Sequence, residues 1–136
     1  MNRVAHSHDT MLAWPLVSPW LERALDKTSS LMTVGDLLRG VRSGAIRLWL
    51  VHRSDRLVGA FATEIGRFSN GAAVNVLALG GIEMPDWIES FDEAVETYAR
   101  ENGCCLIVEM GRPGWKRVLS KLGWVDGPVV MMKVTR

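Results

Sequence analysis

Residues 57–79 decide the fold, and they read LVGAFATEIGRFSNGAAVNVLAL. Leu57 to Ile65 is typical of a β-strand, and Ser69-Asn70-Gly71 supplies a turn into another strand from Ala72 to Leu79. Just upstream, residues 46–50 place a large aliphatic side chain at every second position, and a tight turn follows at Ser54-Asp55-Arg56. The three strands are therefore expected to pair as an antiparallel meander.

Helices are expected before and after this meander. Thr33 followed by Asp36 resembles a capping box, Ser43-Gly44 ends that helix, and Pro85 suits the first turn of a later one. The small residues of the 57–65 strand indicate an element packed close against one face. The expected helices are 18–27, 33–43, 85–102 and 115–122, and two further strands are expected at 105–109 and 129–134.

These elements predict one mixed α/β domain. Their order is α-α-β-β-β-α-β-α-β, and a strand, helix and strand joined by a crossover form a parallel pair beside the antiparallel meander. Helices should then cover both faces of the sheet. We expect residues 1–12 to be a loose lead and residues 13–136 to form the single domain.

Composition excludes several classes of protein. The chain has 136 residues, is 48% hydrophobic and carries a formal charge of +1, which argues against wrapping of nucleic acid through an overall positive field. It has no metal-ligand spacing and no apolar stretch of membrane-spanning length. Cys104 and Cys105 are neighbours and are not expected to form a disulfide. We expect a protein that is not secreted and that has no membrane partner.

Two phrases stand out, Leu57-Val58-Gly59-Ala60, and Val118 to Trp124, which reads VLSKLGW. With the order of elements, they resemble the GNAT superfamily of N-acetyltransferases. Gly80-Gly81 before a long helix, together with Gly111 to Trp115, is more narrowly similar to short GNAT-like proteins encoded in tailed-bacteriophage genomes near virion structural genes. The resemblance covers about residues 12 to 136 and implies the GNAT fold.

The resemblance also implies a binding loop for acetyl-CoA, at Leu79, Gly80 and Gly81. In the family, such a loop holds the pyrophosphate with backbone N–H groups and the start of a helix. Here the leading Arg or Gln of the family pattern is missing, and Glu83 and Asp86 bring negative charge to the place of the pyrophosphate. This loop is therefore a cofactor-binding candidate only if CoA binds, and the main expectation is no cofactor.

The family's catalytic groups are also incompletely matched. Alignment on Lys121-Leu122-Gly123 puts Leu119 where the family commonly has a tyrosine that protonates the CoA thiolate, and leucine has no proton to donate. Glu64 and Asn75, on neighbouring strands, are the candidates for a catalytic base in an active enzyme. An ordinary solvent-facing charge is the alternative for Glu64.

Charge is segregated along the chain. Residues 82–101 hold seven acids and one base, a net charge of −6, whereas residues 111–136 hold six bases and one acid, a net charge of +5. This polarity suits docking to complementary proteins, although two solvated helix faces would look the same. The candidate interaction residues are Arg112, Trp115, Lys116 and Arg117.

Our leading expectation is a GNAT-fold phage protein that has lost acyl transfer and works by binding, as a virion or virion-assembly component. Its partners would be phage structural proteins or copies of itself, and its location would be the host cytoplasm and the virion. The alternative is an active acetyl-CoA-dependent N-acetyltransferase of a protein or small amine. A third alternative is a host-directed phage inhibitor.

Overall fold

A computed structural model describes residues 2–5, 10–27, 31–109, 113–127, 132–133 and 135. Its elements follow the chain in an order that begins with a strand and ends with a helix. They are β1 (Asn2–Ala5), α1 (Thr10–Asp26), α2 (Val34–Ser43), β2 (Arg47–Arg53), β3 (Arg56–Phe68), β4 (Gly71–Gly81), the 3₁₀ turn η1 (Met84–Asp86), α3 (Ile88–Glu101), β5 (Leu106–Glu109) and α4 (Pro113–Ser120).

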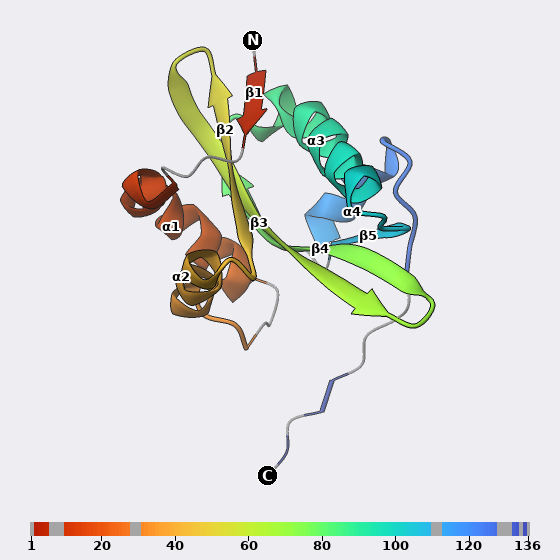
Figure 1. Ribbon diagram of the computed structural model, residues 1–136. Coiled ribbons are helices and arrows are strands. Elements are labelled where there is room, and N and C mark those ends of the chain that lie inside the picture. Colours follow the sequence, from red (N-terminus) through yellow and green to blue (C-terminus); the bar gives the residue numbers. More distant parts are fainter. Residues whose placement is uncertain are drawn as a thin grey trace.

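The sheet has the order β1-β2-β3-β4-β5, so each strand lies beside its neighbour in the sequence (Figure 1). β1 to β4 pair antiparallel, and β4 and β5 pair parallel because α3 carries the chain back across the sheet. The predicted mixed α/β class, with a meander followed by a parallel pair, is confirmed.

Helices cover both faces of the sheet, and each face has its own core (Figure 1). On one face α1 and α2 pack on the small residues of β3 and β4. On the other face α3 and α4 pack on aromatic and branched residues. The first core includes Val17, Leu21, Leu37, Ala60, Ala62 and Ala78, and the second includes Trp49, Phe61, Val76, Trp87, Phe91 and Leu119.

Close packing explains two glycines of the meander. A Cβ on Gly59 would come 2.5 Å from the Trp87 ring, and a Cβ on Gly80 would come 2.9 Å from the Trp20 carbonyl oxygen of α1. Both distances are shorter than real Cβ contacts. The small residues of the meander therefore let helices approach the sheet on both faces, as the sequence predicts for one of them.

α2 begins and ends at the residues that the sequence predicts. The Thr33 hydroxyl accepts a hydrogen bond from the Asp36 N–H, and an Asp36 carboxylate oxygen accepts one from the Thr33 N–H. The bond from the Thr33 N–H to the carboxylate lowers the pKa of Asp36 below its ordinary value. Gly44 ends the helix in the left-handed conformation, with φ of 87°.

The N-terminal part of the chain differs from the expected loose lead. Asn2–Ala5 pair with β2, and α1 begins at Thr10 although the sequence pattern places its start at Ser18. Pro15 and Pro19 lie inside α1, and because proline normally ends a helix, the sequence does not predict a helix across them. Burial of Val17 and Leu21 against the sheet outweighs that cost.

The predicted strand 129–134 falls mostly outside the described residues. A search of the described helices finds none with both the length and the apolar character needed to cross a membrane.

Candidate functional site

β4 and β5 pair over only part of their possible length. Leu106–Glu109 lie beside Ala73–Val76, whereas β4 continues to Gly81. On its other side, β4 pairs with β3 through a register shift that leaves Leu77 without a partner, because Ala62 faces Ala78 and the next residue faces Val76. Such a bulge bends a strand. Beyond Val76, β4 has no paired neighbour on the β5 side among the described residues.

A cavity of about 580 Å³ lies between the segments that follow these two strands. One wall comes from Met84, Pro85 and Ile88, after β4, and the other from α4 and the turn behind it, after β5. Most of the lining is apolar, and Lys121 brings a positive charge to it. The second wall is formed by Gly114, Trp115, Val118 and Lys121. A largely apolar ligand with an anionic group matches these walls.

The acidic residues beside this cavity are engaged by arginines of the β2–β3 hairpin. Arg53 lies 2.6 Å from the Asp86 carboxylate, and Arg56 forms an ion pair with Glu83. Glu83 has a φ of 55°, so the backbone takes a left-handed turn there. The negative charge that the sequence places at the start of the long helix is thus partly neutralised. Nothing in the sequence pattern pairs residues this far apart.

The glycine loop proposed for CoA is held by packing with its neighbours. Leu79 is buried in the core, and Gly80 lies against α1. Gly81 has a φ of 148°, and a Cβ there would come 2.2 Å from the Val58 carbonyl oxygen. The two glycines are therefore required by the fold whether or not a ligand binds.

Glu64 and Asn75 are brought together. They face each other directly across β3 and β4, so their side chains lie on the same face of the sheet. Both are half-buried, and Val108 of β5 lies opposite Asn75 on that face. The face is the one that carries α1 and α2. The carboxylate and amide are therefore placed to act together on a polar group.

Glu109 is a candidate that sequence reasoning missed. It ends β5 opposite Val76, next to the bulge in β4, and shares the α3 face of the sheet with Val76. Its Oε2 atom is buried without a hydrogen-bond partner in the described part of the chain. Desolvation by burial raises the pKa of Glu109 from 4.5 to about 7. The signal in the sequence was an acid at the end of the strand predicted over residues 105–109.

Leu119, a residue of α4, is buried in the core. It has no group that could exchange a proton. A proton donor at this site would have to come from another element, and Glu109 lies at the end of the adjacent strand.

The candidate interaction residues of α4 are only partly free. Trp115 lines the cavity and packs against the core, and Lys116 lies 3.1 Å from Asp126. Arg117 is exposed, and Arg112 lies outside the described residues. Lys116 and Arg117 therefore present charge to solvent, whereas Trp115 belongs to the cavity wall.

The described residues contain no group of three or more potential metal ligands. Cys104 is half-buried and Cys105 is exposed, and both are free thiols. The site is thus built from carboxylates, an amide, a lysine and an apolar cavity.

No protein-family model matches the sequence, and no curated protein matches it either. Solved structures do match in fold. A predicted acetyltransferase with acetyl-CoA from Clostridium acetobutylicum has a TM-score of 0.74 at 11% identity, over 98% of this chain and 96% of that one. Glucosamine-6-phosphate N-acetyltransferase from Arabidopsis thaliana has a TM-score of 0.67 at 11% identity, over 100% and 99%.

A GNAT family acetyltransferase from Staphylococcus aureus has a TM-score of 0.61 at 13% identity, over 99% of this chain and 98% of that one. At such identities the likeness shows the fold and not the activity. The chain therefore has the fold of the GNAT acetyltransferases.

Proposed function

We propose that this chain is an acyl-CoA-dependent N-acyltransferase of the GNAT superfamily. The observation that carries the proposal is the cavity of about 580 Å³ between the segments that follow β4 and β5. Its apolar walls suit the pantetheine arm of coenzyme A, and the Lys121 ammonium suits the phosphates. The acetyltransferase of the same fold with acetyl-CoA supports this ligand class.

The anionic end of the ligand would lie at the start of α3. The first N–H groups of a helix have no acceptors within that helix, and the helix dipole favours an anion there. Pro85 contributes no N–H, but Arg53 and Arg56 neutralise the nearby carboxylates. The first turn of α3 and Lys121 are therefore the groups that would hold the phosphates.

When bound, acyl-CoA supplies an acyl group activated as a thioester. The chain's own residues then have to deprotonate an amine and return a proton to a sulfur atom. The Glu64 carboxylate accepts the proton of an acceptor ammonium group, and the Asn75 amide beside it orients the acceptor. Glu109 holds a proton near neutral pH on the opposite face, and it supplies the acid that Leu119 cannot.

Isothermal titration calorimetry with acetyl-CoA tests the proposal. We expect micromolar binding, and Lys121→Ala should weaken it about fivefold to tenfold through loss of one charged contact. The matched control is Lys116→Ala, five residues earlier on α4 and paired with Asp126 outside the cavity lining, and it should leave affinity unchanged. Absence of heat at millimolar acetyl-CoA would refute the proposal.

A non-enzymatic role is the second candidate, and the buried Leu119 favours it. On the sheet face that carries Asn75, Phe68 and Leu106 are 74% and 61% exposed, and these apolar side chains would suit a protein partner. A virion or virion-assembly component that binds phage structural proteins or its own copies stays a prediction. Mass spectrometry of purified phage particles addresses it, and absence of the chain from them would remove this role.

A further inference from the structure

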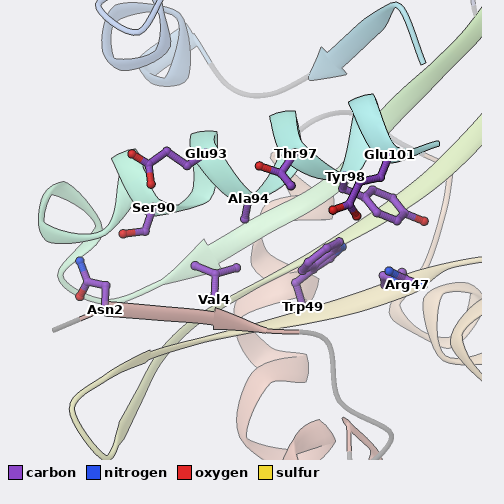
Figure 2. A pocket seen from close by; sticks show the side chains of 10 residues that line it. All are labelled: Asn2, Val4, Arg47, Trp49, Ser90, Glu93, Ala94, Thr97, Tyr98 and Glu101. Atoms are coloured by element: carbon purple, nitrogen blue, oxygen red, sulfur yellow. The ribbon is translucent and has the colours of Figure 1, made fainter. Parts of the chain in front are cut away.

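A second cavity, of about 420 Å³, lies away from the one described above. It is a groove between β1 and β2 on one side and α3 on the other, and Figure 2 shows α3 running alongside β1. None of its lining residues belongs to the acyl-CoA cavity. The groove therefore needs an explanation separate from the proposed acyl transfer.

One end of the groove has an aromatic floor with a cation on it. The rings of Trp49 and Tyr98 meet edge to face, with centroids 5.1 Å apart (Figure 2). The Arg47 guanidinium carbon lies 4.6 Å from the Tyr98 ring centroid and 5.6 Å from that of Trp49. Among the described residues, the Arg47 guanidinium takes part in no ion pair. Its donors are thus positioned by the rings and available to a ligand.

Two carboxylates line the α3 side of the groove, Glu93 near one end and Glu101 near the other. Neither forms an ion pair with any described residue; the glutamate of α3 that pairs with Arg100 is Glu96. Ser90, Thr97 and, across the groove, Asn2 add polar groups. Such an arrangement attracts a ligand with two positive charges and hydrogen-bonding groups between them.

The spacing of the carboxylates matches an extended polypeptide. Glu93 and Glu101 are eight residues apart on α3, which is about 12 Å along a helix. In an extended chain, residues i and i+4 point to the same side and are about 13 Å apart. β1 is the edge strand of the sheet and runs beside the groove. The N–H groups of the Arg47 guanidinium can donate hydrogen bonds to backbone carbonyls of a polypeptide. A polyamine also carries spaced positive charges, but it has no carbonyl to accept these bonds.

We propose that the groove between β1 and α3 binds an extended basic segment of a partner protein, with cationic side chains four positions apart. The two cationic side chains pair with Glu93 and Glu101, and a backbone carbonyl of the segment accepts a hydrogen bond from the Arg47 guanidinium. The groove does not overlap the acyl-CoA cavity, so this interaction is independent of the proposed catalysis.

Fluorescence anisotropy with a labelled, capped KTVTK peptide tests the inference. We expect saturable binding, and weaker binding of KKTVT, which has the same composition and charge with the wrong spacing. Glu93→Gln combined with Glu101→Gln should weaken KTVTK binding about tenfold. The matched control is Glu89→Gln combined with Glu96→Gln, which removes the same charge from α3 outside the groove lining and should change affinity less than about twofold.

The proposal would be overturned by no binding at millimolar peptide, equal affinity for the two peptides, equal loss in the two double variants, or an unchanged affinity in the Glu93 and Glu101 variant. All four substitutions are at exposed positions, and circular dichroism with thermal melting will verify that each variant is folded. Concentration-dependent self-association that disappears in the Glu93 and Glu101 variant would instead assign the groove to a second copy of the chain, which also overturns it.

Discussion

Replacing Glu109 with glutamine should change how stability depends on pH. The folded protein raises the pKa of this carboxyl from 4.5 to about 7, because the side chain is desolvated. A carboxyl with a raised folded pKa binds its proton more tightly in the native state, so folding is penalised as the pH rises. The penalty is absent below about pH 4.5, grows up to about pH 7 and is complete above it. Glutamine has nearly the same shape as glutamic acid but has no proton that titrates in this pH range.

The size of the effect follows from the interval between the two pKa values. About 2.5 pH units at about 1.4 kcal/mol each correspond to about 3 kcal/mol. Urea unfolding, followed by tryptophan fluorescence between pH 4.5 and 8.5, measures it, because Trp49 and Trp87 are buried. Glu109→Gln should have the parent's free energy of unfolding near pH 4.5, and exceed it by up to about 3 kcal/mol at pH 8.

Other titrating groups, such as Asp36, contribute equally to parent and variant, so they cancel in the difference. The matched control is Glu89→Gln, the same substitution at an exposed position of α3. A difference between parent and Glu109→Gln that does not change with pH would refute the reasoning. It would mean that water or another group solvates the Glu109 carboxylate, and the same result would remove the acid assigned to the proposed acyl transfer.

Three further predictions follow from packing, capping and charge. Gly80→Ala should lower the free energy of unfolding by about 1–3 kcal/mol, because the new Cβ would meet an α1 carbonyl oxygen at 2.9 Å. Gly114→Ala, which has open space around it, should not lower it, and denaturant unfolding of both variants measures the difference. Thr33→Ala should cost about 1 kcal/mol through loss of the cap of α2, measured in the same way. The double variant Arg53→Ala, Arg56→Ala should bind acetyl-CoA several-fold more weakly at low salt, because the Asp86 and Glu83 carboxylates near the phosphates lose their partners. Calorimetry at low and high salt measures this, and a loss of affinity that does not depend on salt would contradict it.

The sequence determined by itself the features that depend on near neighbours. The capping box of Thr33 and Asp36 joins groups three residues apart, and the turn at Ser69-Asn70-Gly71 leads β3 directly into β4. These local signals predicted the meander and α2, and with α3 and β5 they predicted the parallel pair. The pairing of Glu64 with Asn75 followed from the same meander.

Only the tertiary structure decided features that depend on distant contacts. α1 begins at Thr10 despite its two prolines because burial against the sheet outweighs local propensity. The pairs of Arg53 with Asp86 and of Arg56 with Glu83 join residues 33 and 27 positions apart.

The candidate site also has features that the sequence predicts and features that only the tertiary structure shows. Residue types alone identified Leu119 as unable to donate a proton, but the cavity forms between segments about 30 residues apart, after β4 and after β5, which only the folded chain brings together. The raised pKa of Glu109 likewise comes from burial, which is a property of the packed molecule. Sequence neighbours set the strands and helices, whereas desolvation and ion pairing between distant segments set the chemistry, because both act through space and not along the chain.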